Sequence, residues 1–321
     1  MSERSGRRVL VTGAGGFLGR GLVARLVAGA LPFDALTLWD ARLAPGQAEL
    51  PGVRVIEADL RNARARQAAF EGAPDLIFHL ASIPSGRSED APRLSHEVNL
   101  TATLDLIEAA SAPKRPPRMV FASSIAALGR LGPGPVDDDT QPRPALTYGA
   151  HKLMGETALA DASRRGLIDG VGLRPAGILA RPSAPTGQRS AFLSEVFHAL
   201  KAGQPFTAPV SEDATSWLIS RPACVEAFLH AATIPSGDLR GRPNLTMPAL
   251  PVRFGDLVAA IGKALGRDAA SLVRYEPDAL IQANFGSYPP LSTPLADGLG
   301  LKADASVEAL VDAALADLEE G

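Results

Sequence analysis

The stretch RVLVTGAGGFLG, residues 8–19, joins a short apolar run to a glycine-rich turn. Residues 8–12 predict a β-strand, and residues 17–29 predict a helix that begins directly after the turn. Gly13, Gly16 and Gly19 have the spacing G-x-x-G-x-x-G, which lets backbone amides at the helix start face a pyrophosphate. A turn that only packs a helix on a strand is the alternative. The stretch favours an α/β fold with a dinucleotide site.

Short strands and longer helices alternate through the first half of the chain. Further strands are predicted at 36–39, 53–57, 75–81, 118–123 and 170–174, and helices at 89–112 and from Thr147 onward. After Pro175 the alternation becomes irregular, with helices predicted at 191–202, 254–265 and 306–318. We predict a Rossmann-type doubly wound parallel sheet in residues 1–175 and a smaller C-terminal α+β substrate domain in residues 176–321. Part of 216–247 is expected to return to the first domain.

Composition narrows the classes of function. The 321 residues carry a formal net charge of −3 with both signs interspersed, which gives no reason to expect nucleic acid or a membrane as partner. The single cysteine, Cys224, excludes an intrachain disulfide and a cysteine zinc site, so no metal is predicted. The start of the chain lacks a signal-peptide core, and no apolar run reaches the ~18 residues of a membrane span. The cytoplasm is the expected compartment.

Two acidic positions suit a bound dinucleotide. Asp40 ends the second predicted strand and follows Gly19 by about 20 residues, where a carboxylate binds the adenosine ribose hydroxyls. Its charge would repel a 2′-phosphate, so NAD is favoured over NADP, although the nearby Arg42 weakens this argument. A strand-end cap is the alternative. Asp59 and Leu60 follow the third strand and are predicted to contact the adenine edge.

Tyr148 and Lys152 lie four residues apart in LTYGAHKLMGE, residues 146–156. Positions i and i+4 share a helix face, so the ammonium can lie beside the phenol, lower its pKa from about 10 and bond the nicotinamide ribose. A solvated helix face is the common alternative. Ser124 follows the strand at 118–123 and is predicted to orient the substrate hydroxyl and stabilise a developing oxyanion. Capping of a turn is its alternative role.

Several motifs occur in one order and resemble the extended short-chain dehydrogenase/reductases, which include sugar-nucleotide epimerases. They are TGAGGFLG, Asp40, Asp59-Leu60, HLAS at 79–82, VNLTAT at 98–103, SSIAALG at 123–129, YGAHK and LRPAGIL at 173–179. The resemblance implies that NAD is bound by the turn residues with Phe17 and Leu18, by Leu80, Ala81, Ser82 and Asn99, and by Pro175 and Ile178 beside the carboxamide. It also implies a homodimer built on the helices near 90–112 and 147–166.

Within that superfamily the chain is most similar to the D-erythronate dehydrogenase group. The runs that carry this resemblance are HLASIPSG, TYGAHKLMGE, SRRGLIDGVGLR, ARPSAPTGQRSAFLSEV, SEDATSWLISRPACVEAF and GRPNLTMPAL. It implies NAD-dependent oxidation of the C2 hydroxyl of a small sugar acid, D-erythronate to 2-oxo-D-erythronate. The epimerase segment R-D-[YF]-[IV]-H-V-x-D is absent, and Ile125 and Ala126 replace the acidic dyad that dehydration requires.

Arginines in the predicted substrate region favour a small acid, because the guanidinium fork binds a carboxylate through two hydrogen bonds. The candidates are Arg174, Arg181, Arg189 and Arg221, each with a structural role as the alternative. Arg181 and Ser190 are the preferred substrate-binding pair, and Ser85 is predicted to contact a hydroxyl.

Three conspicuous side chains are not expected to catalyse. His79 lies in an apolar predicted strand and is expected to be a core histidine. His151 is expected to point away from Lys152 around the helix, and Trp217 is expected to pack in the core. Two other functions stay open. One is a sugar-nucleotide 4-epimerase of the same superfamily. The other is a non-catalytic NAD(P)-sensing protein, which the Tyr-x-x-x-Lys pair argues against.

Overall fold

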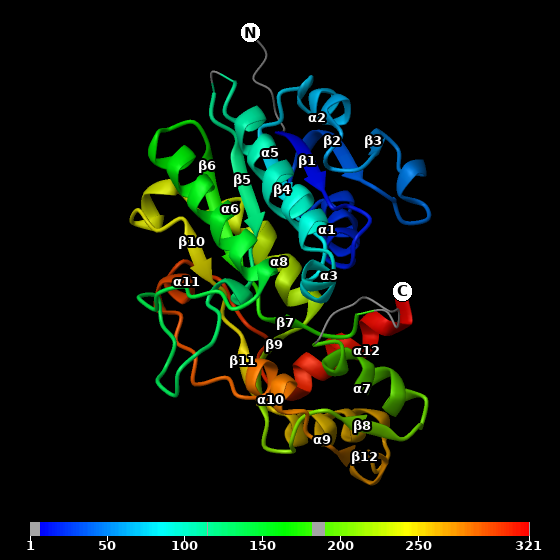
Figure 1. The fold of residues 1–321 in the computed structure, drawn as a ribbon. Coiled ribbons are helices and arrows are strands. Elements are labelled where there is room, and N and C mark those ends of the chain that lie inside the picture. Colours follow the sequence, from blue (N-terminus) through cyan, green and yellow to red (C-terminus); the bar gives the residue numbers. More distant parts are fainter. Residues whose placement is uncertain (1–6, 114, 182–189, 321) are drawn as a thin grey trace.

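Strand β1 (Arg7–Thr12) lies inside a parallel sheet that is covered on both faces (Figure 1). The computed structural model describes residues 7–113, 115–181 and 190–320. Val9 and Val11 belong to one buried core and Leu10 to another, because alternate residues of a strand point to opposite faces. A sheet with two apolar faces needs helices on both sides. The predicted doubly wound α/β fold is confirmed.

The large sheet has seven strands, and each neighbouring pair is parallel. Their order is β10 (Asn244–Thr246), β6 (Asp169–Arg174), β5 (Arg118–Ala122), β4 (Leu76–His79), β1, β2 (Phe33–Asp40) and β3 (Val53–Glu57). The chain runs outward from β1 to β3 and then returns to β4 on the other side of β1. Open α/β sheets bind ligands at this reversal, beyond the carboxyl ends of the strands.

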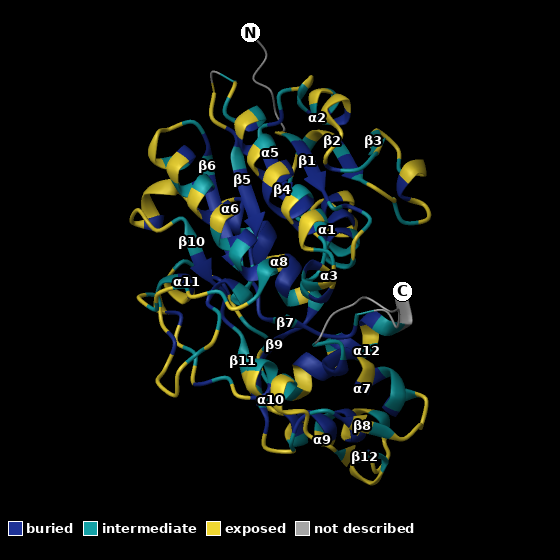
Figure 2. Cartoon of the chain, in the orientation of Figure 1, coloured by how far each residue is buried: buried dark blue, intermediate teal, exposed yellow. Residues whose placement is uncertain are grey.

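Different helices cover the two faces of the large sheet. Helices α1 (Phe17–Val27) and α8 (Arg221–Ala231) pack against each other on one face. Helices α2 (Ala63–Phe70), α5 (Ala102–Ala110) and α6 (Thr147–Arg164) form the other layer. The central strands β1, β4, β5 and β6 are mostly buried, and the outward faces of the helices are exposed (Figure 2).

The helix predicted at 89–112 is wrong in its continuity. The segment forms α3 (Ser85–Asp90), α4 (Pro92–Ser95), a π-helical turn (His96–Thr101) and then α5. Ala91 leaves the helical region with φ −132° and ψ 67°, and Pro92 begins the next helix, where its missing N–H costs nothing. The π turn holds Asn99, whose side chain accepts from Ile83 N at 2.8 Å and donates to Ile83 O at 3.0 Å. Such turns occur often at functional sites.

A second core lies beyond the carboxyl ends of the large sheet. Strands β7 (Gly177–Ile178), β9 (Thr215–Ile219) and β11 (Leu250–Arg253) form one small sheet, and β8 (Phe206–Ala208) pairs with β12 (Val273–Tyr275). The helices here are α7 (Phe192–Lys201), α9 (Phe254–Leu265), α10 (Ala279–Phe285), α11 (Pro294–Gly298) and α12 (Val307–Glu320). Within the described residues no helix has the length and apolarity that crossing a bilayer requires.

Candidate active site

A cleft of 760 Å³ opens at the carboxyl ends of β1 and β4 and is lined by residues of both cores. It brings together many predicted site residues: Gly13, Gly16, Phe17, Leu18, Gly19, Leu80, Ser82, Ser85, Ser124, Tyr148, Lys152, Pro175, Ile178, Arg181 and Ser190. The other predicted residues, Asp40, Asp59, Leu60, Ala81 and Asn99, do not line its wall. Arg189 lies outside the described residues.

The glycine turn leaves the start of α1 open to an anion. Gly16 is the N-cap, no side chain caps the helix, and its first turn holds no acidic residue. A Cβ at Gly13 would lie 2.5 Å from Ala81 N, and one at Gly19 would lie 2.0 Å from Gly13 O. Larger residues would therefore push the turn out of place. Backbone amides and a positive helix end fit the pyrophosphate of a dinucleotide.

Asp40 lies beside this turn, at the end of β2. One carboxylate oxygen accepts from Gly15 N at 2.9 Å and the other from Arg42 N at 3.1 Å. Each oxygen keeps a further lone pair, so ribose hydroxyls can still donate to the carboxylate. A Cβ at Gly15 would lie 2.1 Å from Arg42 O, which shows how closely the following loop approaches the turn.

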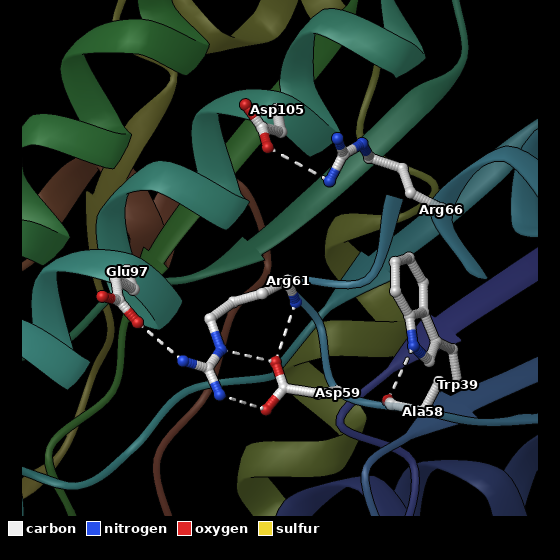
Figure 3. A network of polar contacts seen from close by, with 7 residues as sticks. All are labelled: Trp39, Ala58, Asp59, Arg61, Arg66, Glu97 and Asp105. Carbon is white, nitrogen blue, oxygen red and sulfur yellow. Dashed lines mark hydrogen bonds and ion pairs between the residues drawn. The ribbon is translucent and has the colours of Figure 1, made fainter. Parts of the chain in front are cut away.

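Asp59 belongs to a charged network at the next strand end (Figure 3). Its carboxylate accepts from Arg61 Nε at 2.9 Å and from Arg61 Nη2 at 3.0 Å, and Arg61 Nη1 reaches Glu97 at 2.6 Å. These bonds tie the loop after β3 to the π-helical turn. Leu60 is buried in the core, so only its backbone is available to a cofactor. The adenine contact at these two residues stays a prediction.

Tyr148 stands in the first turn of α6 and faces the cleft. Glu89 fixes the helix start by accepting from Thr147 N at 2.6 Å. Burial raises the pKa of Tyr148, and the Ser82 hydroxyl, the charge of Arg181 and the Ser124 hydroxyl each oppose that increase. The phenol is therefore protonated as it stands, and further positive charge is needed before it can act as a base.

Lys152 is only 2% exposed, and its ammonium donates to Ala122 O at 2.6 Å. Its Nζ lies 5.5 Å from the centroid of the Tyr148 ring. Burial lowers the pKa of Lys152 to about 7, while the charge of Glu156 opposes the decrease. Arg181 is a cation that the motif did not include, and its charge lowers the pKa of Tyr148. That Lys152 also lowers the pKa of the phenol stays a prediction.

Ser124 has the capping role that was its alternative, while its predicted role toward the substrate oxygen stays a prediction. Its Oγ accepts from Ala126 N at 3.1 Å and so caps a short 3-10 turn (Ile125–Ala127). The same hydroxyl interacts with Tyr148 in the cleft. An acceptor bond leaves the hydroxyl hydrogen free to donate to a substrate oxygen.

Glu156 is a buried carboxylate that the motifs did not identify. It is 1% exposed, accepts from Ser123 Oγ, and pairs with Arg174 through Nε at 2.8 Å and Nη2 at 2.6 Å. Ser123 lies between Ala122, the acceptor of Lys152, and Ser124. The network therefore fixes the end of β5 against α6. The signal in the sequence was its position four residues after Lys152, on the same helix face.

A charge-neutral substitution of Glu156 should change the pH dependence of catalysis. Glu156→Gln keeps an acceptor for Ser123 but removes the charge that holds up the pKa of Lys152, so that pKa falls below about 7. The ammonium is then lost at lower pH. We expect the ratio of kcat/KM between wild type and variant to grow as the pH rises toward about 7 and then to level off.

Ser123→Ala is the matched control, because it removes a hydrogen bond to Glu156 and keeps the charge. Its loss of kcat/KM should be the same at every pH. An equal, pH-independent loss in both variants would show that Glu156 has only a structural role.

The predicted arginines divide into paired and unpaired groups. Arg174 is paired with Glu156, and Arg221 with Asp317 on α12. Arg181 lines the cleft, donates from Nε to Ile178 O at 3.3 Å and lies 5.6 Å from the ring of Phe17. No carboxylate of the described residues forms an ion pair with it. Arg181 is therefore placed to receive the carboxylate of a ligand.

The other conspicuous side chains have structural partners, as predicted. His79 bonds Thr12 at 2.7 Å and Thr103 at 2.9 Å through its two ring nitrogens, and burial lowers its pKa to about 3, so it stays neutral. His151 bonds Ser95 Oγ at 2.9 Å. Trp217 is 1% exposed and donates to Pro289 O at 2.8 Å, although its edge borders the cleft.

An anion-binding helix start and a Tyr-Lys pair share one cleft at the switch point of a parallel sheet. That combination defines the NAD-dependent oxidoreductases that act on CH–OH groups with the extended short-chain dehydrogenase/reductase fold.

Comparison with known proteins agrees with this class. Residues 9–238 match the NAD dependent epimerase/dehydratase family. D-erythronate dehydrogenase from Cupriavidus necator is 33% identical over 318 residues, covering 96% of this chain and 98% of that protein. D-erythronate dehydrogenase from Haemophilus influenzae is 31% identical, covering 95% and 97%. The nucleoside-diphosphate-sugar epimerase structure from Agrobacterium tumefaciens is 32% identical with a TM-score of 0.89, covering 100% of this chain and 98% of that one. The chain belongs to the NAD dependent epimerase/dehydratase family.

Proposed function

We propose that this chain oxidises the C2 hydroxyl of a small sugar acid with NAD, and that the substrate is D-erythronate, which yields 2-oxo-D-erythronate. The proposal is carried by the position of Arg181. This arginine lines the cleft with Tyr148 and has no carboxylate partner among the described residues. Two relatives that align with nearly the whole chain are named D-erythronate dehydrogenase, which supports the same substrate class.

When bound, NAD would supply the acceptor for the hydride of C2 and the positive charge of an oxidised nicotinamide ring. Tyr148 removes the hydroxyl proton, and Ser124 donates a hydrogen bond to the same oxygen. Arg181 binds the carboxylate, while Ser190 and Ser85 contact other hydroxyls. Loss of a hydride from C2 and a proton from its oxygen leaves the 2-oxo acid.

The shape of the glycine turn indicates which residues would bind the cofactor. In this proposal the backbone of Gly13 to Gly19 would hold the pyrophosphate, and the Asp40 carboxylate would accept hydrogen bonds from the ribose hydroxyls. Asn99 acts indirectly, because it holds Ile83 beside Ser82. The carboxylate of Asp40 should disfavour the 2′-phosphate of NADP.

A substrate screen tests the proposed function. Four- to six-carbon aldonates and uronates are offered with NAD and with NADP, and kcat/KM is measured from NADH or NADPH formation. D-erythronate with NAD should give the highest value, and NADP should be at least about tenfold poorer. Interconversion of UDP-glucose and UDP-galactose without net NADH formation would instead show a 4-epimerase. Binding of NAD without any turnover would show a sensor.

We also propose a homodimer that works in the cytoplasm. The resemblance places the dimer contact on the helices near 90–112 and 147–166, and Leu104 on α5 and Met154 on α6 are apolar side chains of these helices that are 40% and 46% exposed. Cys224 is a buried free thiol, in accord with a reducing compartment. Light scattering should give twice the 33.4 kDa mass of one chain, and a monomer mass would contradict the dimer.

A further inference from the structure

One wall of the cleft joins a run quoted in the sequence analysis to a later segment, around residues 285–288, in which no motif was identified. Ser216 and Trp217 of β9, Phe285 at the end of α10 and Tyr288 in the following loop all line it. Ser216 Oγ donates to Phe285 O, which holds the two segments together. Tyr288 is the member of this wall with a polar end that the described contacts do not use.

The ring of Tyr288 is held firmly. Its backbone N–H donates to Thr215 O at 3.1 Å, and its carbonyl accepts from Thr215 Oγ1 at 2.7 Å. The ring lies 5.0 Å from that of Trp217, which is anchored by Pro289. A side chain fixed on its backbone and on one face presents its hydroxyl at a defined position, as a binding group requires.

The phenolic oxygen of Tyr288 has no hydrogen-bond partner among the described residues. Tyr288 lines the cleft and is only partly buried, so its hydroxyl is accessible to a ligand oxygen that enters the cleft. Burial alone raises the pKa of Tyr288 to about 12, and neither Arg181 nor Lys152 contributes. The group therefore stays a neutral donor, away from the charges that act on Tyr148.

We propose that Tyr288 is a specificity-determining residue whose hydroxyl donates a hydrogen bond to a distal hydroxyl of the sugar acid. This inference rests on the proposed function, in which Tyr148 and Ser124 take the reacting oxygen and Arg181 takes the carboxylate. The neutral oxygens that remain on D-erythronate are its C3 and C4 hydroxyls. Tyr288 takes the more distal C4 hydroxyl, and the C3 hydroxyl is left to Ser85 and Ser190. Phe285 and Trp217 beside Tyr288 form an apolar wall that limits the length of the chain.

The test is Tyr288→Phe, which keeps the ring and removes the hydroxyl. KM for D-erythronate should rise about 10- to 100-fold with kcat and the Kd for NAD nearly unchanged, since one hydrogen bond to bound substrate is lost. Wild type should prefer D-erythronate over its 4-deoxy analogue by a similar factor, and the variant should lose most of that preference. Tyr275→Phe is the matched control, because Tyr275 does not line the cleft.

The outcomes separate the two proposals. If wild type oxidises D-erythronate and Tyr288→Phe keeps the same preference over the 4-deoxy analogue, the role of Tyr288 is overturned and the proposed function stands. A variant that loses kcat at unchanged KM would also overturn it, because that places Tyr288 in the reacting step. If wild type oxidises no sugar acid, the proposed function fails, and the role of Tyr288 fails with it.

Discussion

Replacing Tyr148 with phenylalanine is expected to lower kcat for the sugar acid by about 10²- to 10⁴-fold, the range of a lost general base. The substitution removes the hydroxyl that interacts with Ser82 and Ser124, and it keeps the aromatic ring beside Lys152. Lys152 keeps its bond to Ala122 O, so the Kd for NAD should change little. Steady-state NADH formation and a fluorescence titration with NAD measure the two quantities.

A folded Tyr148→Phe protein that keeps the wild-type kcat would disprove the assignment of the base. Loss of NAD binding together with activity would mean that the phenol supports the cofactor and does not move the proton. Tyr275→Phe removes a hydroxyl from a ring outside the cleft and should leave both quantities at wild-type values.

Removing the charge of Arg181 is expected to give the second large effect. Arg181→Met keeps an unbranched stem beside Phe17 and deletes the proposed partner of the substrate carboxylate. Truncating one member of a buried charge pair costs about 2–5 kcal/mol, so kcat/KM should fall roughly 30- to several-thousand-fold. The preference for the acid over its uncharged amide should disappear with it.

Arg87→Met is the control for this experiment, since Arg87 borders the same cleft but is exposed to solvent. We expect a much smaller effect, because exposed charges are screened. If Arg181→Met weakens NAD and leaves KM for the acid unchanged, Arg181 binds the cofactor and the carboxylate site lies elsewhere.

The sequence predicted the first half of the fold well, because local patterns determine it. Strand β3 was predicted at its observed limits, and β1, β5 and β6 within a residue or two. The helix predicted at 89–112 failed first for a local reason, because the chain leaves the helical conformation at Ala91 and Pro92 begins a new helix. The turn around Asn99 has a second cause, since hydrogen bonds to Ile83, 16 residues earlier, shape it.

The site residues also divide into those that short motifs identify and those that only the tertiary structure brings to the cleft. Gly13, Tyr148 and Lys152 belong to short motifs, and all three line the cleft. Which arginine stays unpaired depended on where Glu156 and Asp317 lie, and no spacing in the sequence shows that. Tyr288 reaches the cleft because its segment is held by Thr215 and Ser216, far away in the chain.

The central claim, hydride transfer from C2 by a Tyr148-based site, is tested most directly with D-erythronate that carries deuterium at C2. The account predicts that each turnover moves the deuterium to the cofactor, so that the NADH is monodeuterated and the 2-oxo acid unlabelled, with a primary isotope effect when hydride transfer limits the rate. Unlabelled NADH with deuterium still in the sugar acid would contradict it, because another carbon would then be oxidised.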